Sequence, residues 1–315
     1  MRLKILVTGA AGFIGSHTVD HLLAAGHTVW GLDNFRTGRR ENLAEALRQP
    51  TFTLVELDVT DEPAFGGLVE QIRPEAIIHL AALVSVPESI ANPALNDLLN
   101  FQATRIVADI ARKHSISRII FASSAAVYGD PAVVPIPEHA IKRPLSPYGV
   151  AKLASENLLL EYASRHGLVA HCQRYFNVYG PRQDPSSPYS GVISIFLDRL
   201  GRNLPATVFG DGEQTRDFIS VHDVARANAL AATAPAIASG VVNICTGQAV
   251  SLNHLWRLLA GDRQDAPVPI HAPPRPGDIQ HSCGCTDAAR ASLGFQARHT
   301  LAEGLRALTG AAPVP

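Results

Sequence analysis

The sequence has few cysteines, few aromatic residues and almost no net charge. Among 315 residues there are four cysteines, two tryptophans and one methionine, and aromatic residues make up 6%. Lysine and arginine number 27 against 28 acidic residues, which gives a net charge of −1. This balance offers no electrostatic argument for nucleic acid or for an anionic membrane as a partner.

Long hydrophobic runs are also missing. The apolar stretch after residues 1–4 stops at Thr8 and Gly9, which is too short for the apolar region of a signal peptide. No stretch reaches the roughly 18 apolar residues that a membrane span needs. We therefore expect a cytoplasmic protein with no membrane partner.

The cysteines give no pattern of a disulfide framework or a metal site. Cys172 and Cys245 lie in apolar, strand-like segments and are interpreted as buried small hydrophobic side chains. Cys283 and Cys285 are separated by one glycine, but no second pair has the spacing of zinc ligands. We predict reduced thiols and no metal, with the role of Cys283 and Cys285 left open.

A glycine-rich turn near the start of the chain is the first positive signal. Residues 3–7 form a short apolar strand, Gly9, Gly12 and Gly15 follow, and residues 16–25 are amphipathic. In such a unit the first glycine allows the tight turn, the second lets a pyrophosphate approach, and the third lets helix and strand pack closely. The helix N-terminus then offers N–H groups to phosphates.

Acidic residues follow at the ends of the next two strands. Residues 27–32 are apolar and end in Asp33, which lies 18 positions after Gly15, close to where a ribose diol is bound in dinucleotide sites. A carboxylate there repels a 2′-phosphate and favours NAD, although Arg36, Arg39 and Arg40 nearby keep NADP open. Asp58 and Val59 close a third strand, where they meet the adenine or simply start a turn.

A tyrosine and a lysine four positions apart are the second signal. On a helix, Tyr148 and Lys152 share one face. The lysine ammonium is expected to stabilise the phenolate and lower the pKa of the tyrosine, which makes the phenol a usable base toward an alcohol. Ser124 lies 24 positions upstream.

Strand and helix patterns alternate as far as about residue 176. The pattern predicts strands near 76–80, 117–122 and 168–176 and helices near 94–114 and 148–166, which is typical of an α/β, doubly wound parallel sheet. Beyond it the chain is rich in proline. We expect a nucleotide-binding domain over 1–176 plus about 221–246, and a smaller C-terminal substrate lobe over 177–220 and 247–315.

Further motifs occur in order along nearly the whole chain, at residues 8–17, 32–34, 79–82, 123–129, 148–152, 174–182, 209–221 and 275–278. On these motifs the chain resembles the extended short-chain dehydrogenase/reductases, and within them the NAD-dependent nucleotide-sugar epimerases of the UDP-glucose/UDP-N-acetylglucosamine 4-epimerase type. The resemblance implies a Rossmann-like NAD-binding domain, a UDP-sugar substrate and C4 epimerisation through a transient 4-keto sugar.

The resemblance also implies residue roles. Tyr148 takes the proton of the sugar 4-hydroxyl, Lys152 binds the nicotinamide ribose, and Ser124 hydrogen-bonds the same hydroxyl. The implied cofactor contacts are Gly9, Gly12, Phe13, Ile14, Gly15, Asp33, Asn34, Asp58, Val59, Leu80, Ala81, Ala82, Asn100, Tyr148, Lys152 and Tyr175. The implied substrate contacts are Ser85, Ser124, Asn177, Val192, Arg216, Arg275, Asp278 and Ser282. Ser85 and Ser89 either face the sugar or only form hydrogen bonds within their own loop.

Departures from the family pattern narrow the reaction. Val84 stands where many such 4-epimerases carry a lysine, so one cofactor contact is missing. Ala125 and Ala126 stand where 4,6-dehydratases have an Asp-Glu pair and where decarboxylases have Glu, so elimination and decarboxylation are excluded. A UDP-glucuronate 4-epimerase stays open. So does an NAD-binding redox-sensing regulator, although it would have no need of the triplet.

Sugar preference and assembly are further expectations from the resemblance. Ser282 stands where the family places a large side chain in enzymes confined to glucose and galactose, so room is left for a 2-acetamido group. We expect UDP-GlcNAc/UDP-GalNAc as substrates, with UDP-Glc/UDP-Gal as a second pair. The family's homodimer uses a four-helix bundle of the helices near 94–114 and 148–166. Two alternatives are open for the apolar residues of the first helix: they form the dimer face of this bundle, or they belong to the core of the domain. These residues are Leu95, Leu98, Leu99, Ile106 and Ile110.

Overall fold

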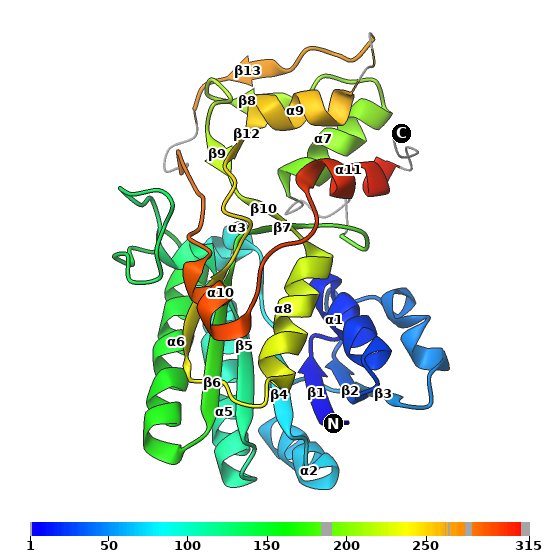
Figure 1. The fold of residues 1–315 in the computed structure, drawn as a ribbon, viewed down its shortest axis with the longest axis vertical. Coiled ribbons are helices and arrows are strands. Elements are labelled where there is room, and N and C mark those ends of the chain that lie inside the picture. Colours follow the sequence, from blue (N-terminus) through cyan, green and yellow to red (C-terminus); the bar gives the residue numbers. More distant parts are fainter. Residues whose placement is uncertain (1, 184–190, 262, 264, 275–278, 310–315) are drawn as a thin grey trace.

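A parallel sheet of seven strands forms the larger part of the molecule (Figure 1). The computed structural model describes residues 2–183, 191–261, 263, 265–274 and 279–309. The strand order is β3-β2-β1-β4-β5-β6-β11, and every neighbouring pair is parallel. The strands are β1 (Lys4–Thr8), β2 (Thr28–Asp33), β3 (Phe52–Glu56), β4 (Ala76–His79), β5 (Arg118–Ser124), β6 (Val169–Tyr175) and β11 (Gly240–Ile244).

Helices cover both faces of this sheet, which confirms the predicted doubly wound α/β fold. The helices α2 (Glu62–Ile72), α5 (Ala103–Lys113) and α6 (Pro147–His166) pack on one hydrophobic cluster, and α1 (Phe13–Ala24) and α8 (Val221–Thr233) pack on the other. The central strands are rich in apolar residues because both of their faces are buried in this way. The segment near 221–246 contributes α8 and β11 to this layer structure, with β11 beside β6.

The helix predicted near 94–114 is not one regular α-helix. It begins as α4 (Pro93–Asn96), widens into the π-helical segment η3 (Asp97–Gln102) and continues as α5. Inside the wide turn Asn100 donates to the carbonyl of Leu83 and to the side chain of Asn96, at 3.1 and 2.8 Å. Such π-helical turns are frequent at functional sites because they re-aim a side chain.

The sequence left open whether the apolar residues of this helix form a face for a second subunit or belong to the core. Ile106 and Ile110 are buried in the core of the sheet, so for them the core alternative is correct. Leu98 is 45% exposed, and Val150 on the neighbouring helix α6 is 53% exposed. A face for a second subunit would therefore have to use these two residues.

Helix α6 forms where the sequence supplies a cap and a start. The Ser146 hydroxyl accepts from the Gly149 amide at 3.2 Å, Pro147 occupies the first turn, and Gly167 ends the helix with φ of 72°. The predicted helix at 148–166 is confirmed, and it places Tyr148 and Lys152 in its first two turns.

A smaller lobe lies above the sheet in Figure 1 and has a hydrophobic core of its own. Three two-stranded pairings build it, together with α7 (Val192–Gly201), α9 (Leu252–Ala260) and α11 (Leu301–Thr309). Its core includes the rings of Phe196 and Trp256, which meet edge to face at 5.1 Å. The paired strands are β7 (Asn177–Tyr179) with β10 (Phe218–Ser220), β9 (Thr215–Arg216) with β12 (Val250–Ser251), and β8 (Thr207–Phe209) with β13 (Ile270–Ala272).

The short remaining elements are η1 (Arg40–Leu43), η2 (Ala46–Arg48), α3 (Val86–Ala91), η4 (Ala125–Val127) and α10 (Asp287–Leu293). Among the described residues, no helix is both long and apolar enough to cross a bilayer. The four cysteines are free thiols.

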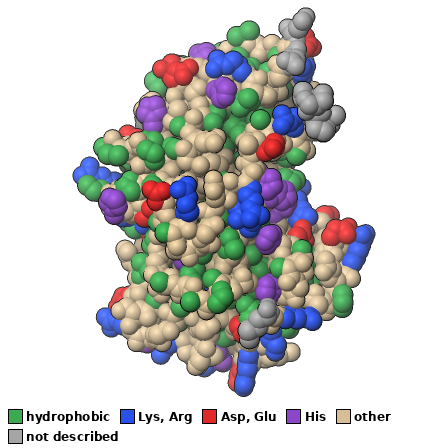
Figure 2. Space-filling view, in the orientation of Figure 1, with side chains coloured by type: hydrophobic (Ala, Val, Ile, Leu, Met, Phe, Trp, Pro, Cys, Tyr) green, Lys and Arg blue, Asp and Glu red, His purple; other side chains and the backbone are tan. Residues whose placement is uncertain are grey.

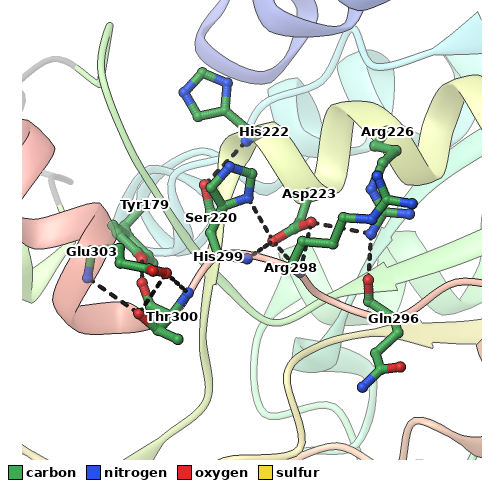
Figure 3. A network of polar contacts seen from close by, with 10 residues as sticks. All are labelled: Tyr179, Ser220, His222, Asp223, Arg226, Gln296, Arg298, His299, Thr300 and Glu303. Atoms are coloured by element: carbon green, nitrogen blue, oxygen red, sulfur yellow. Dashed lines mark hydrogen bonds and ion pairs between the residues drawn. The ribbon is translucent and has the colours of Figure 1, made fainter.

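The two lobes meet at the start of α8, and a buried carboxylate fastens this junction. Asp223 accepts from the amides of Arg298 and His299, both at 3.0 Å, and from the Arg226 guanidinium at 3.1 Å (Figure 3). Histidine side chains and basic side chains (lysine or arginine) gather at mid-height in Figure 2. The segment before α11 is thereby tied to the helix that packs against α1.

Candidate active site

The glycine-rich turn joins β1 to α1 at the point where the strand order reverses. Gly9 has φ of 70°, and a Cβ there would lie 2.8 Å from the amide nitrogen of Ala81, just after β4. A Cβ on Gly15 would lie 2.0 Å from the Gly9 carbonyl oxygen, so α1 can pack this closely only because residue 15 is glycine. In doubly wound sheets, ligands bind at this switch point.

Gly12 differs from its two neighbours in the motif. It caps the N-terminus of α1, and a Cβ on it would have one neighbour within 4 Å in the described part of the chain, the Gly9 carbonyl oxygen at 3.2 Å. Protein packing therefore restricts this position less than the other two. An open backbone at a helix N-terminus fits the approach of a pyrophosphate.

Asp33 ends β2 beside this turn, where the sequence predicts the ribose contact. Its carboxylate accepts from the amides of Ala11 and Phe35, both at 2.8 Å. Burial raises the pKa of Asp33, and these amide hydrogen bonds lower it in part. The loop thus holds a buried carboxylate in a fixed place next to the glycines.

One cavity brings seven of the sixteen predicted cofactor contacts together. Asp58 lies in it and accepts from the Asn34 side chain at 2.7 Å and from the Thr60 amide at 2.8 Å. Burial acts to raise the pKa of Asp58, but the hydrogen bonds from Thr60 and Asn34 outweigh it and hold the pKa below its usual value. The predicted residues that line the cavity are Gly9, Asp33, Asn34, Asp58, Val59, Ala81 and Ala82.

Four further residues line this cavity that the sequence argument did not name as contacts: Leu32, Arg36, Leu57 and Leu99. Leu32 and Leu57 directly precede predicted contacts, which is a signal that could have found them. Arg36 pairs with Glu88 at 2.5 Å. Because that guanidinium is held by a carboxylate, it is a weaker candidate for a 2′-phosphate than its position in the sequence suggests.

These residues fit NAD. The turn offers amide groups at a helix N-terminus, the cavity has apolar walls, and the buried carboxylate of Asp33 suits a ribose diol and disfavours a 2′-phosphate. Leu80 packs between two hydrophobic clusters beside the turn. Phe13 and Ile14 form the first turn of α1.

Tyr148 and Ser124 come together from α6 and the end of β5. Burial raises the pKa of the Tyr148 phenol, and a hydrogen bond with the Ser124 side chain lowers it in part. The Tyr148 amide donates to the Ser89 hydroxyl at 3.3 Å, which fixes the start of the helix. Ser89 is thus a support for the catalytic helix, whereas Ser85 caps α3 by accepting from the Glu88 amide at 3.0 Å.

The predicted effect of Lys152 on the tyrosine is not what the structure shows. Its ammonium nitrogen lies 5.7 Å from the centre of the Tyr148 ring and donates to the carbonyl of Ala122 at 2.8 Å. Burial lowers the pKa of Lys152 to about 7, although Glu156 acts in the opposite direction. The prediction that lysine lowers the pKa of Tyr148 is therefore wrong for this structure, because burial of the phenol is the largest effect and raises its pKa, and the opposing effect comes from Ser124.

A buried ion pair lies beneath the triplet. Glu156, one helical turn after Lys152, binds the guanidinium of Arg174 through bonds of 2.9 and 2.6 Å and also accepts from the Ser123 hydroxyl. Arg174 further donates to the Tyr128 hydroxyl at 2.8 Å. The sequence did not predict this ion pair between Glu156 and Arg174. The i, i+4 spacing from Lys152 to Glu156 could have indicated that Glu156 lies near the triplet, but it carries no information on Arg174.

Two more predicted cofactor residues lie close to the triplet. The Tyr175 hydroxyl donates to Asn228 at 2.6 Å, and the pKa of Tyr175 is raised by burial and by the nearby Tyr148. Asn100 is buried, and its side-chain oxygen has no hydrogen-bond partner among the described residues. Val84, where the family often has lysine, is 66% exposed.

Apart from Ser85 and Ser124, the predicted substrate contacts that the structure describes lie in the smaller lobe and at its base. Asn177 begins β7 and Arg216 ends β9, while Val192 begins α7. The Arg216 guanidinium donates to the carbonyl of Thr215 at 2.9 Å, and Thr215 also accepts from the amide of Ser282 at 3.1 Å. Ser282 is buried. Arg275 and Asp278 lie outside the described residues.

Three comparisons with known proteins agree with this site. The family model described as "NAD dependent epimerase/dehydratase family" matches residues 5–245. The UDP-glucose 4-epimerase of Mycolicibacterium smegmatis is 39% identical over 304 residues, which cover 96% of each chain. Among solved structures, the UDP-glucose 4-epimerase of Thermotoga maritima with UDP-glucose has a TM-score of 0.91, 38% identity and 98% coverage of each chain.

A second solved structure carries a different sugar nucleotide. The UDP-N-acetylglucosamine 4-epimerase of Methanobrevibacter ruminantium, in complex with UDP-N-acetylmuramic acid, has a TM-score of 0.91, 33% identity and 98% coverage of each chain. The Rossmann-like fold and the NAD cofactor expected from the sequence are thus confirmed. The chain belongs to the NAD dependent epimerase/dehydratase family, and it is an enzyme, an NAD-dependent 4-epimerase.

Proposed function

We propose that the enzyme inverts C4 of a UDP-hexose, with UDP-GlcNAc/UDP-GalNAc as one substrate pair and UDP-Glc/UDP-Gal as another. The observation that carries this proposal is the hydrogen bond between the side chains of Tyr148 and Ser124, with the Lys152 ammonium 5.7 Å from the centre of the Tyr148 ring. A hydroxyl pair of this kind suits the removal and return of one alcohol proton.

The positions of the side chains support the catalytic roles that the family resemblance implies. Tyr148 takes the proton of the sugar 4-hydroxyl, and Ser124 hydrogen-bonds both oxygens and helps the proton to pass. When bound, NAD⁺ would supply the hydride acceptor. Lys152 holds the nicotinamide ribose from within the first turns of α6. Burial raises the pKa of the phenol, and the hydrogen bond with Ser124 lowers it in part, so Ser124 favours the phenolate that accepts the sugar proton.

The residues after Ser124 limit the reaction to epimerisation. Ala125 and Ala126 form the short helix η4 and have no proton to give or take, so neither elimination of water nor decarboxylation is assisted there. The 4-keto sugar formed by the oxidation step instead turns within the site. Asn177, Arg216, Arg275 and Asp278 are assigned the grip on the uridine diphosphate, since arginines bind phosphate oxygens through charge-assisted bonds.

The proposed sugar preference rests on volume. Ser282 is small, and a small side chain leaves room for a 2-acetamido group near C2 of the hexose. The solved structure of the Methanobrevibacter ruminantium enzyme contains a nucleotide of an N-acetylated sugar, and that of the Thermotoga maritima enzyme contains UDP-glucose. Relatives of this chain therefore include both a UDP-glucose 4-epimerase and a UDP-N-acetylglucosamine 4-epimerase, which supports both proposed substrate pairs.

Assembly and location complete the proposal. A homodimer through a four-helix bundle would cover Leu98 and Val150, which are exposed on neighbouring elements. The free thiols agree with an enzyme of the reducing cytoplasm. Size-exclusion chromatography with light scattering would test the dimer, and a monomer at all concentrations would refute it.

The function itself is tested with the purified protein. UDP-GlcNAc and UDP-Glc are incubated with it separately, and the two epimers of each are resolved by chromatography. We expect each UDP-sugar to be converted into a mixture with its 4-epimer. The final ratio of the two epimers should be the same whichever epimer the reaction starts from. No conversion of any UDP-sugar, together with no NADH absorbance on adding substrate, would refute the proposal and favour a regulator that only binds NAD.

A further inference from the structure

Asp217 lies between two elements of the candidate substrate site and is completely buried. It follows Arg216 at the end of β9 and precedes Phe218 at the start of β10, and its exposed fraction is 0%. Its Oδ1 accepts from the amide and the hydroxyl of Thr246, at 2.8 and 2.6 Å. A carboxylate this deep in a protein is costly unless it is fully hydrogen-bonded.

The second carboxylate oxygen binds two further segments. Oδ2 accepts from the amides of Gly247 and Gly284, at 2.9 and 3.3 Å, and from the thiol of Cys283 at 3.7 Å. Burial raises the pKa of Asp217, and the bonds from Thr246, Gly247 and Gly284 lower it in part. One side chain thus joins the loop after β11 to residues 283–284, which directly follow Ser282.

Main-chain bonds of the same segment reach the other proposed substrate contacts. The Asp217 carbonyl accepts from the amide of Asn177 at 3.0 Å, and the carbonyl of Thr215 accepts from the amide of Ser282 at 3.1 Å. The loop held by Asp217 leads into β12, where Val250 pairs with Arg216. The three proposed contacts therefore depend on one short stretch of chain.

Successive side chains along an extended segment point to opposite sides. Because the carboxylate of Asp217 points into the interior, the guanidinium of Arg216 is directed to the other side, and Arg216 is only partly buried. An inward anchor at residue 217 therefore also sets the direction of the arginine that is assigned to the diphosphate.

We propose that Asp217 is a positioning residue that holds Asn177, Arg216 and Ser282 in the arrangement that binds the nucleotide sugar. This role rests on the proposed function, because those three contacts are part of it. Asp217 touches neither the reacting atoms nor the triplet of Ser124, Tyr148 and Lys152. Its loss should consequently weaken the binding of substrate and leave the chemical step nearly unchanged.

Asp223 offers a matched control within the same lobe junction. It is also 0% exposed and also accepts from backbone amides, those of Arg298 and His299, but these belong to the segment before α11 (Figure 3). The variants Asp217→Asn and Asp223→Asn make the same chemical change in two equally buried carboxylates. Only the first lies in the segment of the proposed substrate contacts.

The test measures UDP affinity by calorimetry, and KM and kcat for epimerisation, in the NAD-loaded wild-type enzyme and both variants. In Asp217→Asn an amide NH₂ faces amide donors, so we expect Kd for UDP and KM to rise about tenfold, with kcat within about threefold. Both variants should lower the melting temperature of the protein by similar amounts. Asp223→Asn should nevertheless leave Kd for UDP within about twofold of the wild-type value.

A milder variant keeps the test decisive if Asp217→Asn does not fold. Thr246→Val removes the hydroxyl bond to Oδ1 and keeps the shape of the side chain, and a rise of a few-fold in KM is expected. Unchanged UDP affinity in the Asp217 or Thr246 variant, or equal losses in the Asp223 control, would overturn the role of Asp217. A wild-type enzyme that binds no UDP would instead refute the proposed function.

Discussion

The cofactor end and the substrate end of the site each contain a buried carboxylate that accepts hydrogen bonds from backbone amides. The two ends differ in the sequence separation between the carboxylate and those amides. Asp33 binds the amide of Ala11, 22 positions away, within one strand–turn–helix–strand unit. Asp217 binds the amide of Gly284, 67 positions away, and that of Thr246, 29 positions away. Burial raises the pKa of both carboxylates.

This difference teaches which part of a site forms locally. The glycine turn and Asp33 at the cofactor end are in place once β1, α1 and β2 have paired, because they lie within about 30 residues of one another. The substrate end exists only after four segments of the smaller lobe have come together. Changes at the cofactor end should therefore act through local geometry, and changes at the substrate end through the assembly of distant segments.

The largest expected effect lies between the two ends. Replacement of Tyr148 by Phe removes the phenol oxygen that meets Ser124 and leaves the backbone bond from residue 148 to Ser89 intact. We expect the rate of epimerisation to fall by about 10²–10⁴-fold, the usual contribution of a positioned acid–base group. UDP affinity should stay close to wild type, because the substrate end is untouched.

The measurement is initial-rate epimerisation with each UDP-sugar, alongside NAD content and UDP titration. A Tyr148→Phe enzyme that retained a tenth or more of the wild-type rate would show that another group acts as the base. The matched change Ser124→Ala should cost less, since it removes a hydrogen bond and not the proton acceptor.

A second pair of variants sharpens the description of the cofactor end. Gly15→Ala would place a Cβ 2.0 Å from the Gly9 carbonyl oxygen, whereas Gly12→Ala meets the same oxygen at 3.2 Å. We expect Gly15→Ala to lower the stability of the cofactor-free protein by about 1–3 kcal/mol through overpacking. Gly12→Ala should leave that stability nearly unchanged and still weaken NAD binding, about tenfold.

Thermal unfolding without cofactor and NAD titration separate the two effects. If both variants lost stability equally, protein packing alone would explain the spacing of these glycines. The assignment of Gly12 to the pyrophosphate would then have no support from this structure.

At the substrate end the corresponding variant is Ser282→Tyr. Residue 282 is buried and tied to Thr215 through its amide, so a large side chain must occupy space near the proposed sugar. We expect kcat/KM for UDP-GlcNAc to fall about tenfold more than that for UDP-Glc, since exclusion of one substituent is worth roughly 1–3 kcal/mol. Equal losses on both substrates would contradict the volume argument.

The two ends also differ in how far the sequence could predict them. The strand, the glycine turn, the helix and Asp33 were predictable because each step depends on neighbouring residues, and the structure confirms these elements. The π-helical turn around Asn100 was missed, since its composition is that of an ordinary helix. Asp217 was missed as well, because an aspartate between an arginine and a phenylalanine carries no local signal.

The wrong prediction for Tyr148 has the same origin. The i, i+4 spacing correctly placed Lys152 one turn from Tyr148, but spacing gives no information on burial. Burial depends on the packing of β5, α6 and β6, and it raises the pKa of the phenol and lowers that of the ammonium. Sequence predicts which groups meet, whereas their charge states follow from the tertiary structure.

A further expected effect concerns this buried lysine and is seen in stability. Burial lowers the pKa of Lys152 to about 7, whereas in the unfolded chain it keeps the ordinary value of 10.5. Between these two values the unfolded chain binds more protons, so the free energy of unfolding should rise with pH, by at most about 1.4 kcal/mol per pH unit. Below pH 7 both states are protonated and this contribution to the slope vanishes.

The variant Lys152→Met keeps the aliphatic stem and removes the titrating group. The difference in unfolding free energy between wild type and variant, measured by denaturant titration of the cofactor-free protein from pH 6 to pH 9, isolates the lysine from the other titrating groups. We expect this difference to be flat below pH 7 and to move in favour of the wild type above it. A difference independent of pH would mean that Lys152 stays charged when folded, and Glu156, not burial, would then dominate its environment.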